Sequence, residues 1–140
     1  MTLTPTAAAR VLADNVAPWV LDLGLTVESI GSADGHEAVL RLPWSDRLAR
    51  EGGGLSGQAL MAAADTATVI AVAAARGGFV PMTTVQQSIS FQRAVTGADV
   101  LVRARLTKAG RRMAFADITM TADGSEETAA HATAVYALLG

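Results

Sequence analysis

A long run of small apolar residues at positions 59–75 limits what this chain can fold into more than any other feature. The run contains one carboxylate, Asp65, and is followed by Gly77-Gly78, a pair that commonly ends helices. Its length comes close to the roughly 20 residues that cross a bilayer. A carboxylate near the bilayer centre costs about 2.5–3.5 kcal/mol, however, which disfavours a membrane span. We therefore predict a helix over residues 56–76 that is buried inside a soluble protein.

Six segments with alternating apolar and polar residues accompany this helix, a pattern typical of strands. They cover residues 25–30, 37–42, 83–93, 99–108, 113–122 and 128–139. Glycine-containing turns, such as the one at residues 32–35, separate several of them, which favours hairpins in an antiparallel sheet. Because a helix that is apolar on all sides must be covered, we expect an α+β fold in which a curved antiparallel sheet of about six strands wraps it.

The N-terminal part adds a second predicted helix. Thr4 can cap it, Pro5 suits its first turn, and apolar residues follow at three- and four-residue spacing. Pro18 is expected to loosen it near its end. With 140 residues the chain is expected to form one domain, residues 1–140, with this helix within 1–22.

Composition excludes several classes of function. Hydrophobic residues make up 51% of the chain and charged residues 17%, the opposite of the balance in disordered proteins. The net charge of −2 gives no basic surface for nucleic acid. With no cysteine and two histidines, the chain has no disulfide, thiol nucleophile or cysteine-zinc site, and we expect no metal. The first ten residues lack the pattern of a signal peptide, so we expect a cytoplasmic protein.

Two features of the central helix suggest chemistry. A glycine run leads into a helix start that contains Gly57, and unpaired N–H groups at a helix start can hold an anion or a developing oxyanion. Asp65 stands within the apolar helix, where a carboxylate is costly unless it is paired, hydrogen-bonded or functional. Each residue also has a structural explanation, since Gly57 permits close packing and Asp65 can bond to neighbouring groups.

The same helix carries motifs of a known family. Ala64-Asp65-Thr66-Ala67 matches the family motif whose carboxylate lies nine residues after the start of a glycine motif, here Ser56-Gly57-Gln58. Ser88-Ile-Ser-Phe-Gln-Arg-Ala94 is similar to the strand that follows the helix, and His131-Ala-Thr-Ala134 to the last strand. Over residues 25–138 the chain resembles the hotdog-fold thioesterases, in particular the branch typified by phenylacetyl-CoA thioesterase.

This resemblance implies hydrolysis of an acyl-CoA thioester to a carboxylic acid and CoA. Asp65 would act as nucleophile or general base, and the Gly57 N–H would stabilise the oxyanion. CoA belongs to the substrate, and no cofactor is implied. The family combines the two groups from different subunits. Spacing supports this separately, since eight residues place Gly57 roughly 12 Å from Asp65 along the helix. We expect a homodimer that pairs into a tetramer, without nucleic acid or membrane partners.

Three positions of the glycine motif and the loop before it depart from the family. Ser56 stands where the family usually has histidine, and it can still cap the helix. Gln58 stands where the second glycine usually is, and its amide could orient water or a carbonyl. Arg50 replaces an asparagine or glutamine, and it could polarise a carbonyl, meet a CoA phosphate or remain solvated.

Further substrate-binding candidates lie in the second half of the chain. Thr84 and Ser90 belong to the strand after the helix, and Arg111 and Arg112 form a basic turn that suits CoA phosphates or a solvated surface. The aromatic residues Trp19, Trp44 and Phe91 are interpreted as packing residues, with an acyl-pocket role for Trp44 as the alternative. The two histidines, His36 and His131, are interpreted as surface or packing residues because the sequence places no partner beside them.

Two other functions remain open at this point. Because Ser56, Gln58 and Arg50 differ from the family, the chain could bind acyl-CoA without turning it over. A hotdog dehydratase or hydratase is disfavoured, because those reactions usually need a histidine and none lies on the central helix or in the loop before it. Binding without turnover would distinguish the acyl-CoA-binding protein from the enzyme.

Overall fold

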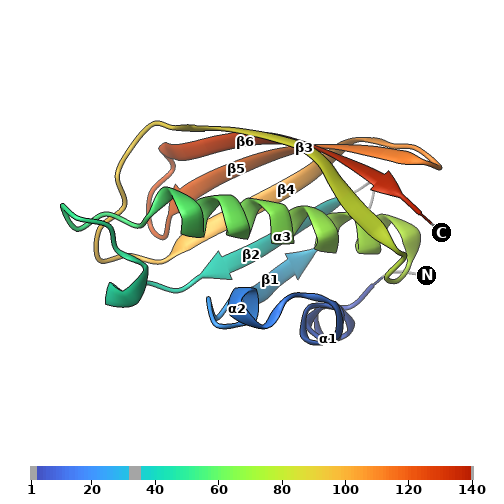
Figure 1. The fold of residues 1–140 in the computed structure, drawn as a ribbon, viewed down its shortest axis with the longest axis horizontal. Coiled ribbons are helices and arrows are strands. Elements are labelled where there is room, and N and C mark those ends of the chain that lie inside the picture. Colours follow the sequence, from blue (N-terminus) through green and yellow to red (C-terminus); the bar gives the residue numbers. More distant parts are fainter. Residues whose placement is uncertain (1–2, 32–35, 140) are drawn as a thin grey trace.

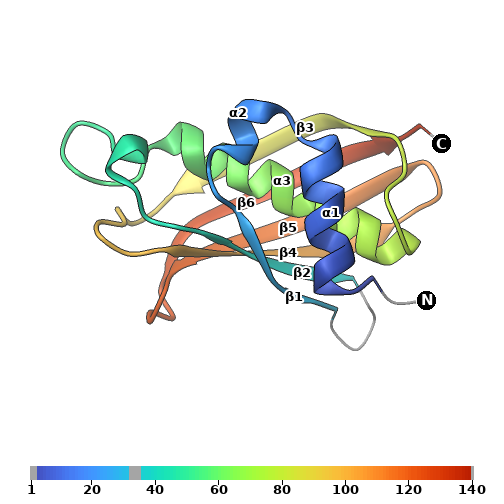
Figure 2. The ribbon, with the colours of Figure 1, turned by 90° about the horizontal axis from the view of Figure 1, so that it is seen from below.

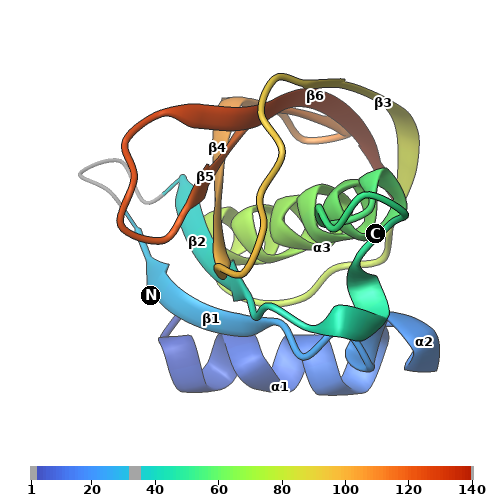
Figure 3. The same cartoon turned by 90° about the vertical axis from the view of Figure 1, so that its left-hand side faces the viewer.

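A curved antiparallel sheet wraps around one long helix in the computed structural model, which describes residues 3–31 and 36–139 (Figures 1 and 3). The elements are α1 (Pro5–Asn15), α2 (Pro18–Leu21), β1 (Thr26–Ile30), β2 (Glu37–Leu42), a 3-10 turn (Asp46–Leu48), α3 (Gly57–Arg76), β3 (Met82–Phe91), β4 (Val100–Ala109), β5 (Met113–Ala122) and β6 (Thr128–Leu138). The strand order is β1-β2-β4-β5-β6-β3, with antiparallel neighbours throughout. The predicted architecture, a curved sheet around a central helix, is confirmed.

The ends of α3 follow from its sequence. Ser56 caps the first turn, since its side chain accepts a hydrogen bond from the Ala59 amide at 3.2 Å. Gly77 ends the helix in the left-handed conformation with φ 76°, which glycine adopts without strain. The helix is apolar and long enough to cross a membrane, but 67% of its most apolar stretch is buried inside the fold. The sheet therefore accounts for its hydrophobicity.

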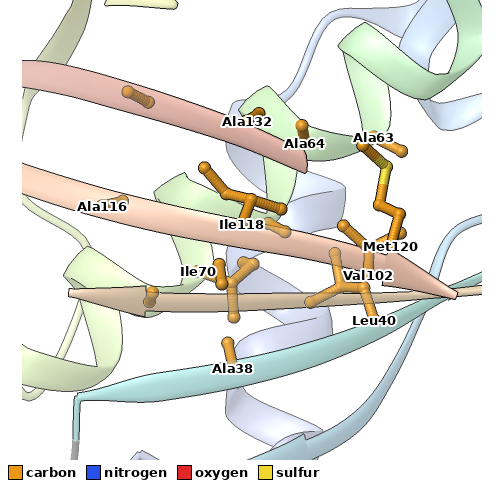
Figure 4. Packing of buried hydrophobic residues seen from close by; sticks show 14 of the residues in the cluster. Ala38, Leu40, Ala63, Ala64, Ile70, Val102, Ala116, Ile118, Met120 and Ala132 are labelled. Atoms are coloured by element: carbon orange, nitrogen blue, oxygen red, sulfur yellow. The ribbon is translucent and has the colours of Figure 1, made fainter. Parts of the chain in front are cut away.

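The core lies between α3 and the concave face of the sheet (Figure 4). Ala63 and Ala64 on the helix are completely buried, and Ile118 and Met120 of β5 are buried on the facing side. Alanine side chains let the sheet approach α3 closely, and the larger residues of β5 fill the remaining space. This packing fixes which residues of α3 face the sheet and which face outward.

The N-terminal helix is divided into two, as Figure 2 shows from below the sheet. Thr4 caps α1 by accepting a hydrogen bond from Ala7 N at 3.1 Å, as predicted. α1 then ends at Asn15, and Pro18 begins the separate short helix α2. Proline has no N–H to continue a helix but suits a first turn, so the division occurs at this position. The break turns α2 toward α3 and β3.

β3 forms one edge of the sheet and contains an irregularity that matters for the site. Thr84 pairs with Tyr136 of β6, and Gln86 pairs with the neighbouring Val135. β3 therefore has one residue more than β6 at this point, and Val85 is the extra residue of a β-bulge. The bulge changes which side chains face α3. Thr84 before it and Gln87 after it both form hydrogen bonds with α3. A regular strand would direct residues an odd number apart to opposite faces.

One arginine ties the loops at the end of the sheet together. Arg41 of β2 forms ion pairs with Glu28, Asp99 and Asp123, from three different parts of the chain. Asp99 also accepts a hydrogen bond from the Trp44 amide at 2.7 Å. That amide, followed by Arg41, holds the pKa of Asp99 below its usual range. The predicted turn at residues 32–35 lies outside the described residues.

Candidate active site

Asp65 lies on α3 beside the edge of the sheet that β3 forms. It borders a pocket of about 330 Å³ between α2, α3 and β3. The pocket is lined by Trp19, Val20, Gln58, Met61, Ala62, Asp65, Thr66, Thr84 and Gln87. Asp65 is the one charged side chain in this lining, and half of the other lining residues are apolar. A second pocket of about 340 Å³ on the other side of α2 also reaches Asp65.

Two hydroxyl groups hold the Asp65 carboxylate. Thr84 of β3 donates from Oγ1 to Asp65 Oδ1 at 2.8 Å, and Tyr136 of β6 donates to the same oxygen at 2.5 Å. The Tyr136 hydroxyl also lies 3.1 Å from the backbone carbonyl of Asp65. Asp65 Oδ2 has no hydrogen-bond partner among residues 3–31 and 36–139. One carboxylate oxygen is therefore held in place, and the other has no partner among these residues.

Tyr136 donates to this carboxylate from the core. Its side chain is buried with 2% of the residue exposed. Burial, followed by the negative charge of Asp65 and the hydrogen bond to it, raises the pKa of Tyr136 far above its ordinary value. The hydroxyl therefore stays protonated and remains a donor at every pH at which the protein would work.

Two glutamines border the same pocket. Gln58, in the first turn of α3, is exposed and lines this pocket. Gln87 donates from Nε2 to the Met61 carbonyl at 3.0 Å, one turn before Asp65. Its other amide atom, Oε1, is buried without a hydrogen-bond partner. Gln87 Oε1 is therefore an unused acceptor at the edge of the pocket.

Gly57 lies in a different pocket, of about 370 Å³, at the beginning of α3. Arg50 and Phe91 line the same pocket. Among the described groups, the Gly57 amide has no backbone or side-chain acceptor, in keeping with a first helical position. A Cβ placed on Gly57 would lie 3.1 Å from the Phe91 ring, so close packing also favours glycine here. The packing explanation for this glycine is therefore confirmed, and the oxyanion role of its amide stays a prediction.

The structure separates the two predicted catalytic groups. Asp65 and Gly57 line different pockets, and eight residues of helix separate them by roughly 12 Å. Within one chain they cannot act on the same carbonyl, because a nucleophile and an oxyanion donor must both lie about 3 Å from the reacting group. Gln58 and Thr84, in contrast, share the pocket of Asp65.

The remaining predicted residues lie apart from these pockets. Ser56 serves as the cap of α3. Ser90 pairs with His131 on the outer face of the sheet, and its Oγ accepts a hydrogen bond from Gln92 at 3.2 Å. Arg111 and Arg112 lie near the other end of α3, where Arg76 donates to the Arg111 carbonyl at 3.4 Å.

The structure corrects the interpretation of Trp19 as a packing residue and adds detail to those of Trp44 and His131. Trp19 is 61% exposed and lines the Asp65 pocket, whereas Trp44 packs against the core and borders neither pocket that reaches Asp65. The acyl-pocket alternative named for Trp44 therefore fits Trp19 better. His131 does have a carboxylate beside it, since its Nε2 lies 2.6 Å from Asp117 Oδ1 on the next strand. The register of β5 and β6 creates this pair.

Sequence reasoning also missed Tyr136 and Gln87. Tyr136 is the one tyrosine of the chain and occupies an inward position in an alanine-rich strand, which is a weak signal that it could have a special role. Gln87 gave no signal, because the Val85 bulge decides the face to which it points. No cluster of three His, Asp or Glu residues suited to a metal occurs within the described ranges.

Comparison with known proteins places these observations in a family. The model of the thioesterase superfamily matches residues 52–129, which include α3, the strands β3, β4 and β5, and the start of β6. A candidate thioesterase from Silicibacter sp. TM1040 is 28% identical, with a TM-score of 0.85 over 99% of this chain and 93% of its own. A search of the curated proteins found no match.

Two more distant structures share the hotdog fold. The PaaI protein of the E. coli phenylacetic acid degradation operon is 18% identical, with a TM-score of 0.82 over 98% of this chain and 96% of its own. A hypothetical thioesterase protein from Streptococcus pneumoniae was solved with coenzyme A. It is 16% identical, with a TM-score of 0.73 over 83% of this chain and 86% of its own.

Proposed function

The chain belongs to the thioesterase superfamily, and on that basis we propose that it hydrolyses an acyl-CoA thioester to a free carboxylic acid and CoA. The observation that carries the proposal is the Asp65 pocket. A single charged group, Asp65, borders an otherwise uncharged space of about 330 Å³, within the usual size range of ligand sites. The apolar surface suits an acyl group, and the carboxylate suits attack on its carbonyl carbon.

In the proposed reaction Asp65 acts through its open oxygen, Oδ2. As general base it takes a proton from water while the water oxygen bonds to the thioester carbon. The tetrahedral oxyanion then collapses, the carbon–sulfur bond breaks, and the thiolate leaves and is protonated to the CoA thiol. As nucleophile Asp65 would instead bond to the thioester carbon, the carbon–sulfur bond would break to release the CoA thiolate, and water would hydrolyse the resulting anhydride. Label in the Asp65 carboxylate after a single turnover in ¹⁸O-water would establish the anhydride route, because general-base attack delivers the label only to the acid product.

The oxyanion donor is proposed to be Gly57 of a second copy of the chain. β3 offers the surface for this pairing, because it is a ten-residue edge strand without any charged residue. Its exposed residues include the apolar side chains Val85 and Phe91. Pairing of two such edges in a two-fold dimer would place the helices antiparallel and produce two equivalent sites. Pairing of dimers into tetramers remains part of this proposal.

CoA is proposed to extend from this site toward basic groups. The S. pneumoniae protein with coenzyme A supports a CoA ligand for this fold. Arg111 and Arg112 are candidates for its phosphates, as is Arg50 beside Gly57. Replacing Arg111 and Arg112 together by glutamine should raise KM for acyl-CoA and leave KM for the matching acyl-pantetheine unchanged.

A thiol-release assay tests the proposed activity. Short, medium, long and aryl-acetyl CoA thioesters are offered to the wild type and to Asp65→Asn, which keeps the size but removes the charge. We expect kcat of the variant to fall about a hundredfold or more, because the attacking group is lost. Asp117→Asn is the matched control, since Asp117 is a partly exposed carboxylate on the outer face of the sheet. Unchanged turnover in Asp65→Asn would reject the assignment of Asp65.

Co-expression of two inactive variants tests the shared site. Gly57→Pro removes the amide donor, and proline suits the first position of a helix, but its Cβ requires the Phe91 ring, 3.1 Å away, to shift by a few tenths of an ångström. Mixed dimers of Gly57→Pro and Asp65→Asn contain one site with both defects and one intact site. Recovery of activity in the mixed dimer supports donation across subunits. If both groups acted within one chain, every site would carry one defect and no activity would return.

The degenerate acyl-CoA-binding protein is the second candidate, favoured by the presence of Ser56, Gln58 and Arg50 at positions where the family differs. Calorimetry on the same panel separates the two functions. Micromolar binding of a thioester that is never hydrolysed would establish a binding protein. Turnover of any member of the panel that depends on Asp65 would establish the enzyme.

A further inference from the structure

We propose that Tyr136 is a positioning residue that, together with Thr84, holds Asp65 so that only Oδ2 can react. This inference rests on the proposed function and concerns the same site. It starts from the finding that both hydroxyls donate to one oxygen, Oδ1, at 2.5 Å and 2.8 Å, while Oδ2 has no partner among the described residues. Without these hydrogen bonds, rotation about the Cα–Cβ and Cβ–Cγ bonds of Asp65 would let either oxygen point in several directions.

The sheet register brings the two donors together. Thr84 of β3 and Tyr136 of β6 are directly paired across the strands, and residues paired in this way point to the same face. That face is the concave one, since Tyr136 is buried against α3. Two adjacent strands therefore present two hydroxyls at the position where α3 presents its carboxylate. The pairing of the two strand backbones therefore sets where the Thr84 and Tyr136 hydroxyls lie.

The Val85 bulge interrupts the regular alternation of β3 immediately after Thr84. Immediately after Thr84 the strand gains an extra residue, and Gln87 then bonds to the Met61 carbonyl of the preceding helical turn. β3 therefore holds α3 at two successive turns, once through Asp65 and once through the backbone. Movement of Asp65 relative to β3 is restrained in both directions along the helix.

Tyr136 is suited to fix an anion because it cannot give up its proton under working conditions. Its burial and the nearby charge raise its pKa, so the phenol remains a donor. Its ring fills an inward site in β6 where Ala132 and Ala134 leave room. The backbone carbonyl of Asp65, 3.1 Å away, is a second acceptor for the hydroxyl. The tyrosine thus holds both the main chain and the side chain of the reacting residue.

Kinetics of Tyr136→Phe test the role. The variant keeps the ring and its packing but removes the donor. We expect kcat to fall about 10- to 100-fold with KM nearly unchanged, because a displacement of about 1 Å in a reacting group can cost a hundredfold. Thr84→Val, at a solvent-accessible edge, removes the other donor without touching the core and should lower kcat in the same way. The melting temperature of each variant shows whether folding is affected.

The single tyrosine provides a readout that packing alone would not move. Tyrosinate absorbance in the wild type reports only Tyr136, because the chain has one tyrosine. We expect it to appear well above the ordinary tyrosine pKa, about 10, and at a lower pH in Asp65→Asn, which lacks the neighbouring charge. A control variant, Asp117→Asn, should leave the titration unchanged.

The outcomes separate this inference from the proposed function. Wild-type kcat in Tyr136→Phe, together with loss of activity in Asp65→Asn, would overturn the positioning role and leave the thioesterase intact. Tyrosinate that forms in the wild type at the ordinary tyrosine pKa, about 10, would overturn it as well. Full activity in Asp65→Asn, or no turnover by the wild type, would instead reject the proposed function, and the positioning role would fall with it.

Discussion

Trp19 offers a direct test of where the acyl group lies. The side chain is 61% exposed at the border of the Asp65 pocket, which for a tryptophan corresponds to about 150 Å² of open surface. An acyl group that covers half of it would bury about 75 Å² on the protein side, worth about 2 kcal/mol at 25 cal/mol per Å². Removing the ring by Trp19→Ala should therefore lower kcat/KM about 30-fold for an aryl-acetyl or medium-chain thioester.

The acetyl thioester provides the internal comparison, because an acetyl group is too short to reach far along the ring. Its kcat/KM should change less than about threefold in Trp19→Ala. Leu21→Ala is the matched control, since Leu21 lies on the same short helix, is 41% exposed and borders neither pocket that reaches Asp65. Equal losses for acetyl and aryl-acetyl thioesters, or no loss for either, would refute this location of the acyl group.

Fluorescence gives the same information without turnover. The chain has two tryptophans, so Trp44→Phe leaves Trp19 as the sole reporter. Trp44 packs against the core and not in the Asp65 pocket, which makes it the appropriate one to replace. In this background, binding of an aryl-acetyl thioester to Asp65→Asn should shift the emission of Trp19 to shorter wavelength. An unchanged spectrum at saturating ligand would contradict contact between them.

Three further predictions concern stability. Ile70→Ala, at a completely buried position of α3, should cost about 2–5 kcal/mol in urea unfolding, because it leaves a cavity against the sheet. Ser56→Ala should cost about 1 kcal/mol in the same measurement, since it removes the cap of α3 and leaves the Ala59 amide unpaired. Asp99 has a lowered pKa in the folded state, so its stabilising contribution is present above its ordinary pKa and is lost as the pH falls through the acidic range. Asp99→Asn should therefore melt below the wild type at pH 7, and calorimetry should find that this difference narrows at pH 3.

The sequence determined the architecture because the relevant signals are local. Alternation in the strands, the cap at Ser56 and the stop at Gly77 each depend on residues a few positions apart, and the structure confirms them. The apolar helix with a single carboxylate also required a sheet around it. The complete division of the N-terminal helix before Pro18 went beyond the expected loosening, and it too has a local cause.

The surroundings of Asp65 were decided by tertiary structure. Tyr136 lies 71 residues after Asp65, and its contact depends on the register of β6 against β3, which no local pattern encodes. The Val85 bulge turns Gln87 toward the helix, although alternation alone would point it away from the face of Thr84. The separate helix α2 brings Trp19 to the pocket. The sequence therefore identified the carboxylate, and the pairing of distant strands supplied the groups that hold it.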